Sequence, residues 1–323
     1  MGPRSVFLIV VTDIDGTLLD HDTYSFAAAK PALTLLRREG VPLILCSSKT
    51  RAEIEILQRE LGIAHPFVSE NGGALFVPVD YFPFRLPGAR RVNGYHAIEF
   101  GRPYEEVVNE LHRLAAALGV TVTGFSDMSD GEIASTCHLP AERARLAKLR
   151  EYDEPFSVAG GDPALRLRLC RCLEDAGLHC TTGGRFDHVT GAADKAVAIG
   201  LLRMLYRRAL ASAPDGGSAV RGVAQEGGFW QPEIRRRRIV TVALGDAPND
   251  VALLREVEIP VIVRSVDARQ TEHLIVQVPY ARVSRGRGAS GWSETVQEVV
   301  RSVLSRNQDA GIVQEPGTQI EGA

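Results

Sequence analysis

The sequence predicts an α/β protein, with a Rossmann-like, doubly wound parallel-sheet core and an α+β cap domain inserted into it. Near both ends of the chain, short apolar runs alternate with amphipathic segments, as in strands joined by helical crossovers. Between residues 82 and 188 the pattern changes to long amphipathic segments with short strand candidates, and the alternation then resumes. A chain of 323 residues is long enough for two such units.

The first elements follow from apolar spacing and from helix end signals. Thr50 and Glu53 have the spacing of a capping box, and Gly62 follows the last apolar position of that segment, so a helix is expected between them. Before it we expect a strand at 6–12, a helix at 26–39 and a strand at 41–46. The inserted module should contain helices at 103–118, 140–152 and 163–177 and a strand at 120–125.

After the module, a helix at 194–208, strands at 239–244 and 261–263 and a closing helix at 293–304 are expected, with the apolar pattern continuing through 251–254. The predicted core therefore comprises 1–81 and 189–306, and the cap comprises 82–188. A segment rich in Gly, Ala and Arg, 211–238, is expected to be a mobile loop, and 307–323 a loose tail.

Composition excludes several classes of function. With 37 basic and 40 acidic residues the formal net charge is −3, which provides no general attraction to nucleic acid or anionic lipid. The basic run at 235–238 is the one feature that could touch nucleic acid, and a solvated loop end is favoured for it. Apolar runs such as 6–11 are far too short to span a membrane. We expect a small-molecule substrate, no nucleic acid and no membrane; the oligomeric state stays open.

The cysteine pattern favours a reduced, cytoplasmic protein. Five cysteines are an odd number and lack the spacing of a disulfide framework. Cys170, Cys172 and Cys180 could be interpreted as a metal cluster, but buried thiols are the favoured interpretation. With no secretion signal at the N-terminus, a cytoplasmic location is expected.

Polar residues follow three of the predicted strands, namely Asp13, Ser47 and Asp246. In an open parallel sheet ligands bind at the carboxyl ends of the strands, so these side chains should converge. Asp13 and Asp15 are two residues apart and project from the same side of an extended segment. One can act as nucleophile or cation ligand while the other exchanges protons. Taken alone, the pair also fits a strand terminus or a glycosyltransferase metal site.

Two further clusters are ambiguous in isolation. Asp246, Asn249 and Asp250 offer oxygen ligands that suit Mg²⁺, but they also suit a helix cap. Ser47, Ser48 and Lys49 stand before a capped helix, where an anion could bind, and a capping role alone remains open. Lys195 would be a routine surface lysine without the other motifs.

Together these residues resemble the four ordered motifs of haloacid dehalogenase superfamily phosphohydrolases: 13–18, Ser47, Lys195 and 245–250. Within that superfamily the chain is similar to the mannosyl-3-phosphoglycerate phosphatase family. That similarity lies in the runs 47–53, 70–73, 124–129, 150–156 and 183–186, in core and cap alike. It does not account for 211–238 or for the tail.

The resemblance implies a two-step phosphoryl transfer. Asp13 would be the nucleophile that forms an aspartyl phosphate, and Asp15 the general acid and then base. Mg²⁺ would be held by Asp13, the backbone carbonyl of Asp15 and Asp246. Ser47 and Lys195 would hold the phosphoryl oxygens, and Asn249 and Asp250 would orient the lysine and the metal's waters. The implied substrate-binding candidates are Lys49, Glu70, Asn71, Gly72, Gly73, Asp127, Met128, Arg185 and His188, with Arg185 a partner for the glycerate carboxylate.

The implied activity is Mg²⁺-dependent hydrolysis of mannosyl-3-phosphoglycerate to mannosylglycerate, a compatible solute, and phosphate. Within the class, glucosyl-3-phosphoglycerate or another phosphosugar is the alternative substrate. From other classes, a metal-dependent glycosyltransferase using Asp13 and Asp15 gives no role to Ser47, Lys195 and the second acidic cluster together. An inactive binding module predicts a missing nucleophile or metal ligand, and the sequence lacks neither.

Overall fold

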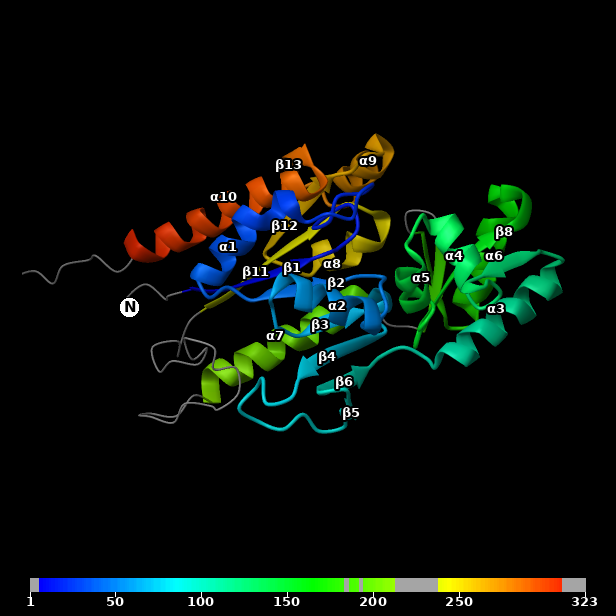
Figure 1. The fold of residues 1–323 in the computed structure, drawn as a ribbon, viewed down its shortest axis with the longest axis horizontal. Coiled ribbons are helices and arrows are strands. Elements are labelled where there is room, and N and C mark those ends of the chain that lie inside the picture. The colour runs from blue at the N-terminus through cyan, green and yellow to red at the C-terminus, as the bar shows by residue number, and fades with distance from the viewer. Residues whose placement is uncertain (1–5, 183–185, 192–193, 213–237, 310–323) are drawn as a thin grey trace, which may run out of the picture.

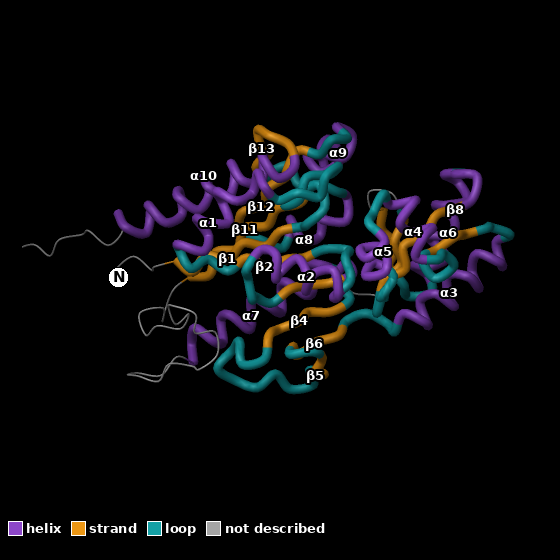
Figure 2. Tube along the Cα trace, in the orientation of Figure 1, coloured by secondary structure: helices purple, strands orange, loops and turns teal. Residues whose placement is uncertain are grey.

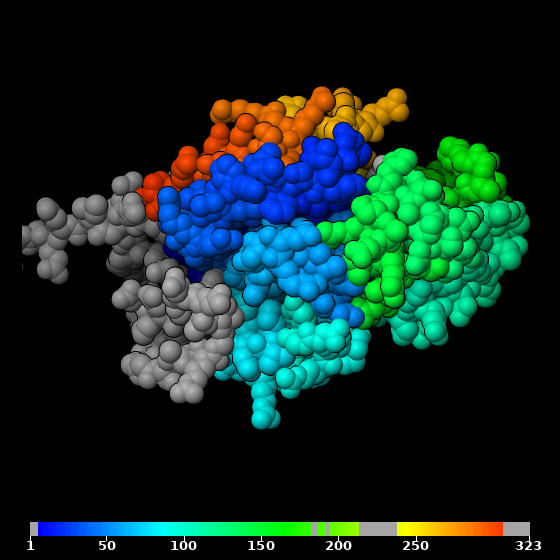
Figure 3. Space-filling view, in the orientation of Figure 1, coloured from blue at the N-terminus to red at the C-terminus, as the bar shows by residue number. Residues whose placement is uncertain are grey.

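The computed structural model describes residues 6–182, 186–191, 194–212 and 238–309. These residues form a large α/β core and a smaller cap that lies against one end of it, as Figure 1 shows with the cap in green at the right. In the space-filling view of Figure 3 the cap packs directly on the blue and cyan part of the core. The predicted fold class, a Rossmann-like core with an inserted α+β cap, is confirmed.

The core is built on one nine-stranded sheet in the order β13-β12-β11-β1-β2-β3-β4-β6-β5. Strands β13 to β3 in that order pair in parallel, and β4, β6 and β5 extend the sheet with antiparallel pairs. Their bounds are β1 Val6–Thr12, β2 Leu43–Cys46, β3 Phe67–Ser69, β4 Ala74–Pro78, β5 Arg90–Val92, β6 Tyr95–Glu99, β11 Arg238–Gly245, β12 Ile259–Arg264 and β13 Arg282–Arg287.

Helices cover both faces of this sheet, as the purple helices on either side of the orange strands show in Figure 2. On one face the apolar cluster holds Leu8 and Val10 of β1, together with residues of three helices: α1 Lys30–Arg38, α2 Arg51–Leu61 and α10 Gly288–Asp309. On the other face Ile9 of β1 packs with α7 Lys195–Ser212, α8 Val251–Arg255 and α9 Ala268–Gln277. Alternate β1 residues thus serve opposite cores, which is why the strand is apolar throughout.

The predicted capping box is present at the start of α2. The Thr50 side chain accepts from the Glu53 N–H, and the Glu53 carboxylate accepts from the Thr50 N–H, while Gly62 ends the helix in the left-handed conformation with φ of 64°. These contacts satisfy N–H groups that have no partner within the helix. They fix the start of α2 directly after the loop that carries Ser47.

The cap holds a four-stranded antiparallel sheet in the order β7-β8-β10-β9. Its strands are β7 Val122–Gly124, β8 Asp153–Val158, β9 His179–Thr182 and β10 Asp187–Thr190. Helices α3 Tyr104–Leu118 and α6 Pro163–Asp175 cover one face. Helices α4 Asp130–Cys137 and α5 Ala141–Ala147 belong to a second apolar cluster, and α5 reaches the core, where Thr50 Oγ1 donates to the Leu146 carbonyl at 2.9 Å.

Several predicted boundaries differ from the structure. The cap does not begin at residue 82, because β5 and β6 extend the core sheet as far as Glu99; the inserted unit follows them and ends with β10. The helix predicted at 140–152 ends at Ala147, since the chain turns into β8. Helix α10 continues to Asp309, into the predicted tail. Most of the segment predicted as a mobile loop, 213–237, lies outside the described residues.

The prediction of five reduced thiols is wrong for two cysteines. Cys170 on α6 and Cys180 on β9 form a disulfide, with Cα atoms 5.5 Å apart. Since α6 packs across β9, residues only 10 apart in sequence face each other at this distance. Cys46 and Cys137 are buried thiols, and Cys172 is a partly exposed one. None of the helices in the described ranges is both long and apolar enough to cross a membrane.

Candidate active site

The structure brings the three strand-terminal residues together at the carboxyl edge of the sheet. Because β11, β1 and β2 are neighbours, Asp246, Asp13 and Ser47 follow adjacent parallel strands. All three line a cavity of about 330 Å³ between core and cap, with Asp15, Lys49 and Asn249 also in its wall. Backbone direction alone accounts for this convergence.

Lys195, the first residue of α7, is 1% exposed and lies between two aspartates. Its Nζ donates to Asp13 Oδ1 at 2.8 Å and to Asp250 Oδ1 at 2.7 Å. Burial lowers the pKa of Lys195, but the charges of Asp13 and Asp250 outweigh burial and raise it above its usual value. Burial also raises the pKa of Asp13 well above the ordinary value, an effect that Lys195 opposes. The lysine is therefore a fixed positive charge beside Asp13.

The acidic cluster fits a divalent cation. Carboxylate oxygens of Asp13, Asp246 and Asp250 all lie within 4.8 Å of one another and are buried. Asp250 is already engaged, since Oδ1 accepts from Lys195 and Oδ2 accepts from the backbone N–H groups of Asp246 and Ala247. Burial and the charge of Asp250 raise the pKa of Asp246 to about 7. Asp13 and Asp246 therefore remain as hard oxygen ligands whose repulsion a Mg²⁺ ion would relieve.

Two further observations support a cation or substrate at this place. The Asn249 Oδ1 and Asp15 Oδ1 atoms are buried and have no hydrogen-bond partner among the described residues. A side chain on Gly16 would not fit, since its Cβ would lie 2.6 Å from Asp246 Oδ2 and its φ is +75°. The glycine thus lets the chain turn while keeping Asp246 close to the β1 loop.

Asp15 stands at the rim of the same cavity. Its carboxyl side chain is 41% exposed, and Oδ2 is 2.8 Å from Lys49 Nζ, which also lies 3.4 Å from Glu53 Oε1. Burial lowers the pKa of Lys49, but the two carboxylates outweigh it and raise that pKa above its usual value. Lys49 therefore lines the cavity as a cation that lies between the carboxyl groups of Asp15 and Glu53.

Glu70, a predicted substrate-binding residue, contacts the backbone of the cap. Its fully buried carboxylate accepts from three successive backbone N–H groups of the cap, those of Glu151, Tyr152 and Asp153, at 2.8–3.1 Å. It does not line the cavity. Burial raises the pKa of Glu70 to about 7, although Arg150 opposes this. Glu70 fastens the entry of β8 to the core.

The neighbouring candidates of this turn also lie behind the cavity wall rather than in it. Asn71 donates to Asp153 Oδ2 at 2.7 Å and accepts from Asn249 Nδ2 at 3.0 Å. Gly72 packs on the chain just before α7, where an added Cβ would lie 2.3 Å from the carbonyl carbon of Asp194, and a Cβ on Gly73 would meet Tyr152 at 2.5 Å. These glycines allow close backbone approach, and they do not line the cavity.

In the cap, His188, a predicted substrate-binding residue, lines the cavity. Asp127 and Met128 do not: Asp127 Oδ2 accepts from the Gly124 N–H at 2.8 Å, and Met128 packs into the α4–α5 apolar cluster. The reason is that both lie in the turn after β7, whose residues bond to one another. Arg185 lies outside the described residues.

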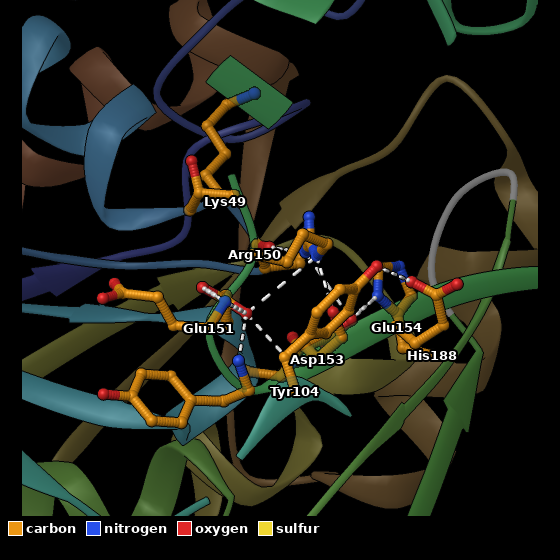
Figure 4. Close-up of polar contacts among 12 residues, drawn as sticks. Lys49, Tyr104, Arg150, Glu151, Asp153, Glu154 and His188 are labelled. Atoms are coloured by element: carbon orange, nitrogen blue, oxygen red, sulfur yellow. Dashed lines mark hydrogen bonds and ion pairs between the residues drawn. The ribbon is translucent and has the colours of Figure 1, made fainter. Parts of the chain in front are cut away.

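Arg150 lines the cavity but is not among the site residues predicted from the sequence. Its side chain is 3% exposed, and Nε donates to the Asp153 carbonyl and Nη2 to the Ser48 carbonyl, each at 2.7 Å. Figure 4 shows Arg150 beside Asp153 and His188. It was interpreted as part of a helix end, and its position in the resembling run 150–156 was the available signal.

Comparison with known proteins agrees with this geometry. The family model described as a haloacid dehalogenase-like hydrolase matches residues 10–80. A glucosyl-3-phosphoglycerate/mannosyl-3-phosphoglycerate phosphatase of Methanococcoides burtonii is 36% identical over 293 residues, 90% of this chain and 97% of the relative. A phosphatase of the same name from Persephonella marina is 32% identical over 297 residues, 92% and 98% of the two chains. The chain belongs to this phosphatase family of the haloacid dehalogenase-like hydrolases.

The prediction that the protein is a phosphoric monoester hydrolase is confirmed by this family membership. Solved structures show the same fold. A haloacid dehalogenase superfamily phosphatase from Bacteroides thetaiotaomicron aligns with a TM-score of 0.59 at 15% identity, covering 92% of this chain and 97% of its own. The sucrose-phosphatase of Synechocystis, in complex with sucrose and phosphate, aligns with a TM-score of 0.54 at 12% identity, covering 93% and 98%.

Proposed function

We propose that this protein is a Mg²⁺-dependent phosphatase that converts mannosyl-3-phosphoglycerate to mannosylglycerate and phosphate. The observation that carries the proposal is the position of Asp13, at the end of β1, with Oδ1 held by Lys195 and with Asp246 beside it in the cavity. The glucosyl compound is the second candidate substrate, because the names of both relatives include it. A glycosyltransferase is not proposed, since the relatives are phosphatases.

The proposed reaction has two steps. Asp13 attacks phosphorus, and the bond from phosphorus to the glycerate oxygen breaks, leaving an aspartyl phosphate. Asp15 gives its proton to the departing oxygen and then takes a proton from the water that hydrolyses the aspartyl phosphate, which regenerates both carboxyl groups. Asp15 lines the cavity, and we assign these proton transfers to Oδ1, which has no hydrogen-bond partner among the described residues.

The remaining residues position charge. Ser47 and Lys195 hold the phosphoryl oxygens, and Asp250 holds Lys195 in place through its 2.7 Å contact. Asn249, anchored by Asn71, faces the same cavity. Bound Mg²⁺ would be held by the carboxylates of Asp13 and Asp246 and by the carbonyl of Asp15, and would offset repulsion between nucleophile and phosphate. A cytoplasmic role in making a compatible solute is part of the proposal.

A substrate panel tests it. Phosphate release with Mg²⁺ is measured from mannosyl-3-phosphoglycerate, glucosyl-3-phosphoglycerate, sucrose 6-phosphate, mannose 6-phosphate and 3-phosphoglycerate, with and without chelator. A preference of at least about 100-fold in kcat/KM for the mannosyl compound, roughly 2.7 kcal/mol, is expected. Equal rates on the two glycosyl-phosphoglycerates would make the enzyme dual, while activity only on the other compounds would overturn the substrate. Release unaffected by chelator would overturn the role of Mg²⁺.

A further inference from the structure

The cap side of the cavity holds a second polar cluster, opposite the aspartates of the core. Arg150 and His188 line the wall, and Asp153 lies behind them with no exposed surface. His188 Nδ1 is 2.9 Å from Asp153 Oδ1, and Arg150 Nη2 is 3.5 Å from the same oxygen. The labelled side chains of Figure 4 show this arrangement, with His188 and Arg150 on either side of Asp153.

Asp153 remains a carboxylate in this cluster. Burial raises the pKa of Asp153, but His188 and Arg150 outweigh burial and hold that pKa below its usual value. Asn71 adds a hydrogen bond to Oδ2 at 2.7 Å. A buried carboxylate with these partners holds both side chains in one orientation, which lowers the cost of ordering them when a ligand binds.

Each of the two cavity-lining side chains keeps a nitrogen without a full set of partners among the described residues. Of the two hydrogens on Arg150 Nη1, one has the Ala147 carbonyl as partner at 3.4 Å, and the other has none among the described residues. His188 uses Nδ1 on Asp153, and within the described part of the chain Nε2 has no partner. When the imidazole carries a proton on each nitrogen, Nε2 is a donor. The wall therefore presents two donors from charged or chargeable groups.

The charges elsewhere in the cavity direct a second anion to this wall. Asp13, Asp15 and Asp246 repel a carboxylate from the core side, where Lys195 already bonds to Asp13. Lys49 is balanced by Asp15 and Glu53, and the remaining lining histidine, His21, pairs with Asp22 at 3.0 Å. Among the basic side chains that line the cavity within the described residues, Arg150 and His188 lie on the cap side and contact Asp153 instead of Asp13, Asp15 or Asp246.

We propose that Arg150 and His188 form a subsite that binds a carboxylate carried by the substrate next to its phosphate ester. This inference rests on the proposed phosphatase function and names the feature of the substrate that the cap recognises. Phosphate then lies at the Asp13 side, and the carboxylate points to the β8 and β10 side of the cavity. Phosphomonoesters that lack a carboxylate are poorer substrates, because Arg150 and His188 then have no partner on the bound substrate.

The first test changes the substrate and needs no variant. Phosphate release by the full-length enzyme with Mg²⁺ is measured on mannosyl-3-phosphoglycerate and on its carboxamide, in which the charge alone is removed, with p-nitrophenyl phosphate as a general phosphomonoester. A carboxylate bound by Arg150 together with His188 predicts a kcat/KM at least about 10-fold higher for the acid than for the amide. Equal values for acid and amide overturn the subsite while leaving the phosphatase proposal intact.

The second test removes one donor. In His188→Asn the side-chain amide can keep the hydrogen bond to Asp153, while Nε2 is lost. The ratio of kcat/KM for the acid to kcat/KM for the amide should then fall toward 1, through a change in KM. The matched control is His112→Asn, which alters another Asp–His pair of the cap, 3.4 Å from Asp127 and outside the cavity, and should keep the ratio. A His188→Asn enzyme that loses kcat equally on acid and amide overturns the subsite. No release from any of the three compounds overturns the phosphatase proposal, and the subsite with it.

Discussion

Replacing Glu70 by glutamine should change how stability depends on pH. The carboxylate is fully buried, and burial raises its pKa from 4.5 to about 7. A carboxyl group whose pKa rises on folding stabilises the protein below its unfolded pKa, and that contribution is lost as pH rises through the folded pKa. A change from 4.5 to about 7 corresponds to roughly 3 kcal/mol. A glutamine side chain does not titrate, so the free energy of unfolding of the variant should not contain this pH-dependent loss.

The assay is urea unfolding of both proteins at pH 5, 6, 7 and 8. The free energy of unfolding of Glu70→Gln, minus that of the wild type, should rise by roughly 2–3 kcal/mol between pH 5 and 8. The difference cancels titrations that both proteins share. Most hydrogen bonds should survive, because Oε2 alone accepts from the N–H groups of Glu151, Tyr152 and Asp153.

Glu99→Gln is the control. Its carboxylate is bonded by Arg90, which lowers its pKa below 4.5, so its contribution is lost only as pH falls below that value. The stability difference for this variant should be flat between pH 5 and 8. A flat difference for Glu70→Gln as well would refute the reasoning. It would mean that the three N–H donors stabilise the charge at least as much as burial destabilises it.

Three other substitutions test the site. Asp13→Asn should lower kcat by at least about 10⁴-fold while thermal unfolding stays cooperative, and wild-type turnover would remove Asp13 as nucleophile. Asp246→Asn should raise the Mg²⁺ concentration for half-maximal rate by at least about 10-fold, and an unchanged Mg²⁺ titration would exclude it as a ligand. Gly72→Ala should cost roughly 3 kcal/mol, because its φ is +103° and the new Cβ would lie 2.3 Å from the Asp194 carbonyl carbon. A denaturation midpoint equal to that of the wild type would show that the turn can rearrange to accommodate the Cβ at little cost in free energy.

The core site was predictable because backbone direction determines it. Residues that end adjacent parallel strands must meet, and the apolar runs before Asp13 and Asp246 are long enough to show where those strands lie. The capping box of α2 was likewise local, so Thr50 and Glu53 predicted it from four residues. Information of this kind lies within a single element or in the order of neighbouring elements.

What the sequence did not predict depends on partners far along the chain. Glu70 resembles an exposed loop residue, and only the fold brings the N–H groups of residues 151–153 to it. Strands β5 and β6 are short and partly exposed, and their sequences lack a long apolar run. They belong to the core sheet because β6 pairs with β4 and β5 pairs with β6. Arg150 is polar and follows a helix, a pattern typical of a solvated end, although its charge is buried against Asp153.

The turn at 70–72 has strained local geometry and is held by contacts with residues far along the chain. Glu70, Asn71 and Gly72 all have positive φ, at 48°, 55° and 103°, which for the two non-glycine residues costs about 1–2 kcal/mol each. The contacts of the turn offset this strain: Glu70 bonds the entry of β8, Asn71 joins Asp153 to Asn249, and Gly72 packs on the residue before Lys195. The cap and Lys195 thus share one support, and a displacement of β8 is expected to act on both.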